Sequence, residues 1–413
     1  NTTAAISSVK GKDIENVPFA TFDGLLQGRV AGLNVLSVSA EPGATGIVNI
    51  RGNSSVSDPT GAGVATGISA PLYVIDGVVF DVRDSRSIGN SNPLAVINPN
   101  DIESVDVLKD ASAAAIYGAR AANGVIIVRT KRPRNGRPQF RVSSYVGLVT
   151  QPSQKPVIIG AEERRLKMDI LREQASYLQQ RGLSQFLTDS LNPAFNNATD
   201  FQDLFFQNGM IRNYDLNIAA ASETMSYRLS VNRYEEDGIQ PGYGIYRTAP
   251  RLFVSAKPSS KLEITSDTYF GFIKEQRGDG TGNVTPYSIQ TFPSSFWQID
   301  DVTRTNYLGK NDRVRDDNRT TSLNGNLRLN YKPTQDITFT SSFSYNFGFL
   351  RRDYLRDRSV VANNRSDAFL TESNSRRWEI ENFATWNKII GSDKEHNISL
   401  LVGQGAEEQV INS

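Results

Sequence analysis

The feature that most constrains the fold is an alternation of apolar and polar residues after about residue 138. In Ile337–Phe349, one parity is mostly aromatic or aliphatic, whereas the other holds only Thr, Ser, Asn and Gly. A period of two is typical of a β-strand whose two faces meet different surroundings. The same alternation runs through Leu323–Lys332 and Lys261–Phe272. Further strands are expected at about 139–149, 213–221, 224–234, 246–257, 376–388 and 396–405, about nine in all.

Two all-β architectures alternate in this way, a water-soluble sandwich and a membrane barrel. The expected strands have about 10–14 residues, which suits a tilted membrane crossing of about 9–11. Their connections alternate between short and long, with a long first loop at about 151–212, as in outer-membrane barrels. Aromatic residues also lie near strand ends: Tyr331, Phe349, Trp378 and Trp386. The sequence therefore favours antiparallel transmembrane β-barrel strands over residues 139–413.

The polar parity of these strands carries charges that would be very costly against lipid. We therefore expect this parity to face a wet or plugged interior. Its charged residues are Arg141, Asp215, Arg228, Glu263, Asp267, Arg328, Glu379 and Glu381. The long first loop contains a helical pattern at Glu162–Arg181. Only 38% of the residues are hydrophobic, but a low apolar fraction does not make the protein soluble, because a wide barrel turns half its strand residues inward.

Residues 1–131 have a different texture and predict a small α+β domain. Short apolar runs separated by Gly, Asn, Asp and Pro indicate strands at Leu33–Val38, Ile47–Arg51, Leu72–Ile75, Ile102–Leu108 and Val125–Thr130. Helices are expected at Thr21–Ala31 and Ala111–Tyr117. Residues 132–138 have no periodicity and are interpreted as a linker.

Composition excludes several classes of function. The chain has no Cys and a single histidine, His396, so thiolate chemistry and metal sites built on several histidines are absent. With 45 Lys and Arg against 44 Asp and Glu, it lacks the basic excess of a nucleic-acid-binding protein. An enzyme would need a carboxylate pair, and the nearest, Glu379 and Glu381, lies on one strand face without a partner. We expect no catalytic residues, no cofactor and no metal.

Four segments of the first domain carry a family resemblance. They are Leu26–Val35 (LQGRVAGLNV), Ile50–Asn53 (IRGN), Pro71–Val78 (PLYVIDGV) and Asn98–Lys131, which contains NPNDIESVDVLKDASAAAIYGARAANG. In this order they resemble the plug of the SusC/RagA-type TonB-dependent transporters. The resemblance implies a plug inside a barrel of about 22 strands. It also implies the outer membrane of a Gram-negative bacterium of the Bacteroidetes type, TonB and a SusD-like surface lipoprotein as partners, and oligosaccharide or oligopeptide cargo.

The resemblance also assigns site residues. It predicts that Arg51 and Lys109 lock the plug by pairing with barrel carboxylates. The polar stretches 53–69 and 81–93 would reach the external cavity, where Asp58, Arg83, Asp84 and Arg86 could touch cargo or simply be solvated. The plug signature residues are Asp76, Gly77, Asp101, Glu103, Asp110, Tyr117, Gly118, Arg120 and Gly124. Its glycines could equally be ordinary turn residues. Tyr145, Tyr243 and Trp297 are candidates for stacking on cargo or for packing.

Two expectations concern the extent of the chain and its role. No TonB box is visible in this chain, and further barrel strands are expected after Ser413. The function predicted is TonB-dependent import of oligosaccharides or oligopeptides through a plug-gated barrel with a lipoprotein lid. The alternative is a structural subunit of a larger secretion or motility complex in the cell envelope.

Overall fold

The computed structural model describes most of the chain. The described residues are 6–15, 17, 19, 21–36, 41–44, 46–52, 70–80, 93–110, 117–118, 121–133, 135–151, 153, 156–173, 184–200, 206–278, 294–298, 313–358, 365–390 and 396–412. Among them, no helix is both long and apolar enough to cross a membrane.

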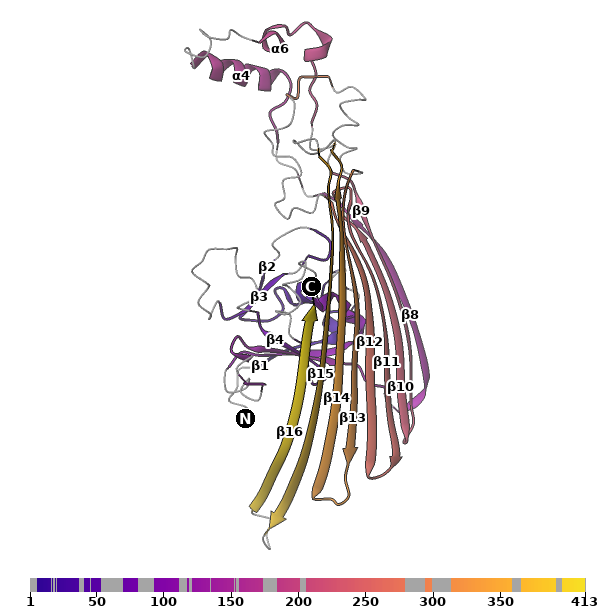
Figure 1. Ribbon diagram of the computed structural model, residues 1–413. Coiled ribbons are helices and arrows are strands. Elements are labelled where there is room, and N and C mark those ends of the chain that lie inside the picture. The colour runs from indigo at the N-terminus through magenta and orange to yellow at the C-terminus, as the bar shows by residue number, and fades with distance from the viewer. Residues whose placement is uncertain are drawn as a thin grey trace.

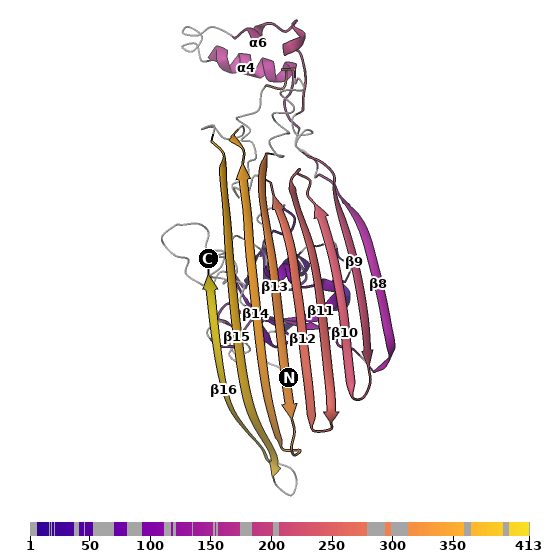
Figure 2. The ribbon, with the colours of Figure 1, turned by 45° about the vertical axis from the view of Figure 1, so that its right-hand side comes forward.

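One large antiparallel sheet forms the wall of the molecule. Its strands follow chain order, each paired with the next, as Figures 1 and 2 show. They are β8 (Gly136–Val149), β9 (Gly209–Ala221), β10 (Met225–Asp237), β11 (Tyr243–Ser259), β12 (Leu262–Arg277), β13 (Val314–Tyr331), β14 (Ile337–Arg356), β15 (Asp367–Ile390) and β16 (His396–Asn412). These nine described strands confirm the predicted fold class, an α+β domain followed by part of an antiparallel barrel.

The alternation has the predicted orientation. Apolar side chains such as Phe140, Leu252 and Phe343 are exposed on the outer face, whereas Asp215 and Arg228 on the opposite parity are buried. Figure 1 shows the N-terminal domain lying on that inner side of the curved sheet. The lipid-facing and interior-facing sides of a barrel differ in this way.

The N-terminal domain, here called the plug, contains two sheets. The larger has the order β1-β6-β7-β4-β5, and the smaller pairs β2 with β3. The elements are β1 (Ile6–Lys10), η1 (Gly11–Asp13), α1 (Phe22–Leu26), β2 (Leu33–Leu36), β3 (Ile47–Ile50), β4 (Leu72–Ile75), β5 (Val78–Phe80), η2 (Pro93–Val96), η3 (Pro99–Asp101), β6 (Ile102–Leu108) and β7 (Val125–Thr130).

The plug and the wall share one hydrophobic core. Phe22 of α1 is fully buried and meets Tyr73 of β4 edge to face at 6.3 Å between ring centroids. The same cluster continues into the wall through Ile211, Ile245 and Ile273. Burying each such side chain contributes about 1.5–3 kcal/mol, so the plug is bound to the wall by apolar packing as well as by polar contacts.

Several boundaries differ from those predicted. The first helix ends at Leu26 rather than at Ala31, because Gln27 leaves the helical conformation and Gly28 adopts positive φ. Strands β1 and β5 were not predicted, since β1 (ISSVK) has no continuous apolar run and β5 has only three residues. β8 begins at Gly136, inside the predicted linker. The predicted Ala111–Tyr117 helix lies mostly outside the described residues.

Connections at the two ends of the wall differ in length. The end carrying the short turns 222–224 and 260–261 lies opposite α4 (Ala161–Glu173) and α6 (Gln185–Thr188), which Figure 1 shows above the sheet. The helix expected at Glu162–Arg181 is described only as α4, with residues 174–183 outside the described part.

Candidate functional site at the plug–wall interface

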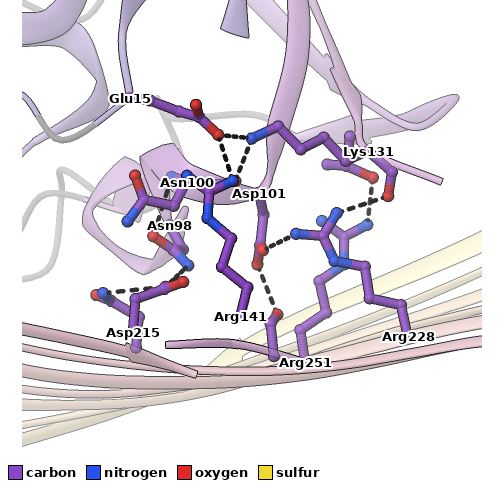
Figure 3. A network of polar contacts seen from close by, with 12 residues as sticks. Glu15, Asn98, Asn100, Asp101, Lys131, Arg141, Asp215, Arg228 and Arg251 are labelled. Atoms are coloured by element: carbon purple, nitrogen blue, oxygen red, sulfur yellow. Dashed lines mark hydrogen bonds and ion pairs between the residues drawn. The ribbon is translucent and has the colours of Figure 1, made fainter. Parts of the chain in front are cut away.

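The segment holding η2 and η3 brings plug polar groups to the wall. Asn98 caps η3 by accepting a hydrogen bond from the Asn100 N–H at 3.1 Å, and Pro99 follows at the first position. The same Asn98 donates from Nδ2 to Asp215 Oδ2 of β9 at 2.7 Å. One side chain therefore shapes the plug and also attaches it to the wall (Figure 3).

Asp101, the last residue of η3, receives two donors from β10. Arg228 Nη2 lies 2.6 Å from Oδ1, and Ser230 Oγ donates to Oδ2 at 2.7 Å. Arg228 also donates from Nη1 to the carbonyl oxygen of Lys131 at 2.7 Å. Because the side chains of Arg228 and Asp101 are only 9% and 5% exposed, this is a buried, charge-assisted contact.

Asp76 is presented by the turn between β4 and β5. It has φ +49 and precedes Gly77 with φ +90, the pattern of a two-residue hairpin turn. Its Oδ1 accepts from the Thr130 N–H at 3.0 Å, and Arg251 Nη2 of β11 lies 2.6 Å from its Oδ2. Burial alone would raise the pKa of Asp76, but Arg251 and Thr130 hold the pKa of this carboxyl below its usual range.

Arg251 is shared between the plug and the wall. Its Nε donates to Asp267 Oδ1 of β12 at 2.9 Å while Nη2 contacts Asp76. One guanidinium thus joins two carboxylates from different parts of the fold. All three side chains are 12% exposed, so the group lies almost completely out of water.

Arg247, four residues earlier on β11, makes a third buried contact. It is 1% exposed, donates from Nη1 to the carbonyl oxygen of Ala95 at 2.8 Å, and donates from Nη2 to Asn232 Oδ1 at 2.9 Å. We call Arg228, Arg247 and Arg251 with their plug partners Asp101, Ala95 and Asp76 the arginine latch.

A steric contact complements the latch. Gly271 of β12 faces Val96 of η2 so closely that an added Cβ would lie 2.4 Å from Val96 Cγ1. Only glycine leaves room for the plug at this point of the wall.

Comparisons with known proteins identify relatives of this chain. Residues 1–125 match the TonB-dependent Receptor Plug Domain family. The chain is 29% identical over its whole length to TonB-dependent receptor P26 of Formosa agariphila, covering 40% of that protein. It is 30% identical to TonB-dependent receptor SusC of Bacteroides thetaiotaomicron over 57% of the chain and 21% of that protein. Residues 1–125 thus match a TonB-dependent receptor plug, and the chain as a whole is similar to TonB-dependent receptors, SusC among them.

Solved structures agree on the fold. The RagAB peptide importer in its closed-closed state matches 99% of the chain and 49% of its own, with a TM-score of 0.75 at 21% identity. A mutant of the ferric enterobactin receptor PfeA from Pseudomonas aeruginosa matches with a TM-score of 0.61 at 14% identity. The chain therefore spans about half the length or less of these relatives. These matches indicate an outer-membrane β-barrel protein, of which the chain forms a plug and part of a barrel; the relatives are TonB-dependent receptors and importers, not enzymes.

The predicted locking residues have plug partners among the described residues. Arg51 Nη1 lies 2.6 Å from Asp110 Oδ1, and Lys109 Nζ donates to Ser7 Oγ at 2.5 Å. Neither contact involves a wall strand, so pairing of Arg51 and Lys109 with barrel carboxylates stays a prediction. The latch instead uses arginines from the wall, which meet two carboxylates and one backbone carbonyl oxygen of the plug.

The remaining predicted residues are distributed as follows. Asp76 and Asp101 lie in the latch, Gly77, Gly118 and Gly124 adopt positive φ, and Tyr117 packs against the cluster around Leu72. Glu103 is exposed beside η1. The other predicted positions lie outside the described residues: Arg120, Asp58, Arg83, Asp84 and Arg86.

Sequence reasoning missed Glu15, Asn98, Arg247 and Arg251. The two arginines lie on the inward parity of the predicted strand 246–257, a signal that was available. Glu15 bridges Lys131 of the plug and Arg141 of β8, with Arg141 Nη1 at 3.0 Å from Oε1. Burial would raise the pKa of Glu15, but these two cations hold it below its usual range.

The aromatic candidates for cargo stacking have different surroundings. Tyr145 packs against the shared core, and Tyr243 is 8% exposed, so both are largely covered. Trp297 is 38% exposed and meets Phe186 of α6 at 5.4 Å between centroids. The neighbouring Phe296 is fully buried, and the guanidinium of Arg164 in α4 lies over its ring. This cation–π contact connects two long loops of the chain.

Proposed function

We propose that the full-length protein imports oligosaccharides or oligopeptides across the outer membrane through a plug-gated barrel driven by TonB. The observation that carries the proposal is the arginine latch, in which buried wall arginines meet plug groups. Such contacts have a defined geometry, and each loses its energy when the partners separate. They suit a plug that must close the barrel at rest and yield when it is pulled.

The relatives support the proposed partners and location. SusC and the RagAB importer support a SusD/RagB-type surface lipoprotein that covers the barrel and captures cargo. Its host would be a Gram-negative bacterium of the Bacteroidetes type, with the barrel crossing the outer membrane many times. The end of the wall that carries α4 would face outward, since long loops lie on the external side of such barrels.

Uptake in the native host tests this function. The complete gene is deleted, and uptake of labelled oligopeptide and oligosaccharide mixtures is compared between the deletion strain and a strain that carries the gene again. We expect one class of mixture to be taken up only with the gene, and a protonophore to stop that uptake because TonB draws on the proton gradient. Equal uptake with and without the gene would contradict the proposal.

Copurification separates import from the alternative role as a structural subunit of an envelope complex. A tagged full-length protein is expected to bring down a SusD-like lipoprotein in equal amount. Stoichiometric recovery of secretion or motility components, without that lipoprotein, would support the structural role.

A further inference from the structure

A polar cavity of about 940 Å³ lies between the plug and the first wall strands. Its plug side is formed by β1, η1 and the ends of β6 and β7, and its wall side by β8, β9 and β10. The wall residues belong to the short-turn end of the strands, as Arg141 is near the start of β8 and Ala219 near the end of β9. The cavity is therefore at the end opposite α4.

The lining carries an excess of positive charge. Among the described lining residues, seven are Lys or Arg and three are Asp or Glu, a net charge of +4. The acids are occupied in part, because Asp215 accepts from Asn98 and Glu15 holds Lys131 and Arg141. Lys10 and Lys12 are exposed and pair with no acid in the described part of the chain.

Such a lining attracts anions. Charges of one sign in a recess with low-dielectric walls concentrate the field and raise the local concentration of counter-ions. Lys10 is the last residue of β1 and Lys12 lies in η1, and within the described part of the chain β1 is an edge strand that pairs with β6. In the same cavity, the ion pair between Glu15 and Arg141 connects the plug directly to β8 (Figure 3).

We propose that this cavity, the basic vestibule, is an exit for anionic solutes on the short-turn side of the barrel, closed at rest by the Glu15–Arg141 contact. The inference rests on the proposed import function, because an importer needs an exit at this end. It adds a chemical preference: carboxylate- or sulfate-bearing solutes pass more readily than cations of the same size.

Solute efflux from proteoliposomes containing the full-length protein tests the vestibule. The probes are labelled gluconate, sorbitol and N-methylglucamine, which are similar in size. Gluconate is an anion, sorbitol is neutral and N-methylglucamine is a cation. Arg141→Ala is expected to speed efflux of all three, with gluconate fastest and N-methylglucamine slowest. The matched control is Arg165→Ala, which removes an exposed arginine from α4 at the opposite end.

Charge reversal tests the preference. Adding Lys10→Glu and Lys12→Glu to Arg141→Ala leaves four basic and five acidic lining residues, so the net charge becomes −1. Efflux of N-methylglucamine should then exceed that of gluconate, while rapid sorbitol efflux shows that the channel is intact. Arg141→Ala efflux no faster than that of the control, or an unchanged order of the charged probes, would overturn the inference.

The assay needs neither cargo nor TonB. Equal uptake with and without the gene in the native host, together with the expected efflux order, would contradict the proposed function alone. Normal import with an unchanged efflux order would contradict the vestibule alone.

Discussion

At the scale of single residues, arginines of the wall form ion pairs and hydrogen bonds with polar groups of the plug and of the wall itself. Arg251 meets Asp76 of the plug and Asp267 of the adjacent strand, and Arg228 meets Asp101 and a backbone carbonyl. A buried charge that loses its partner is strongly destabilising, whereas exposed pairs contribute little. The exposed Arg51–Asp110 pair should therefore matter less to the plug than the latch does.

Arg251→Ala is expected to release the plug. It leaves the two carboxylates Asp76 and Asp267 buried without their shared cation, a loss of about 3–5 kcal/mol. The measurement is the urea concentration at which the plug of the full-length protein becomes sensitive to protease. Lys388→Ala is the control, because its pair with Asp336 is exposed and contributes about 0–1 kcal/mol. Equal midpoints for the two variants would contradict a role for Arg251 in plug attachment.

Glu15 predicts a pH dependence of plug attachment. Its pKa in the folded protein lies below the ordinary value of 4.5, so its contribution is complete above that value. The contribution is lost as the pH falls through the lowered pKa, because protonation ends the pairing with Lys131 and Arg141. The difference in urea midpoint between wild type and Glu15→Gln should thus be largest near neutral pH and vanish in acid. A constant difference across this range would count against the pairing.

At the scale of elements, paired strands extend beyond the alternating sequence. β15 runs from Asp367 to Ile390, whereas the alternation predicted only 376–388. Its full length pairs with β14 or β16, since backbone hydrogen bonds continue wherever a neighbouring strand is present. Side-chain pattern therefore identifies the part with two different faces, and pairing determines the ends.

The Gly271–Val96 contact predicts a steric effect on docking of η2. In Gly271→Ala, the new Cβ would lie 2.4 Å from Val96 Cγ1 and 2.7 Å from Ser322 Oγ. Overpacking of this kind costs about 1–3 kcal/mol, so the plug should become protease-sensitive at lower urea. The control is Gly325→Ala, where the nearest atom is 3.9 Å away. Adding Val96→Ala should raise the midpoint again, because it removes the closer of the two contacts; no recovery would assign the clash to Ser322 Oγ.

At the scale of the whole molecule, the inner face of the wall also carries pairs that do not involve the plug. Arg352 meets Asp316 at 2.7 Å, and Arg377 meets Glu407 at 2.7 Å, each between neighbouring strands. These pairs leave the wall hydrophilic inside even where the plug is removed.

Deletion of residues 1–131 from the full-length protein should consequently leave a folded, open pore. The expected result is greater sensitivity of the cells to a large hydrophilic antibiotic, with the barrel still detected at the cell surface. Surface labelling of an external loop provides the control for assembly. A barrel that is present but gives unchanged sensitivity would contradict occlusion by the plug.

The sequence by itself determined the elements and their faces. A period of two identified the wall strands and their inward charges, Asp215, Arg228 and Asp267 among them, because alternation reports which side of a strand each residue occupies. The order of the plug segments identified the family. Neither the alternation nor the plug segments predict which residue pairs with which in an ion pair or a hydrogen bond.

Only the tertiary structure decided those partners. Arg251 and Asp76 are 175 residues apart, and Arg228 and Asp101 are 127 apart. Whether they meet depends on strand register and on how η2, η3 and the β4–β5 turn pack against the wall. Arg51 and Lys109 illustrate the limit: their motifs were recognised, yet packing within the plug placed them beside Asp110 and Ser7.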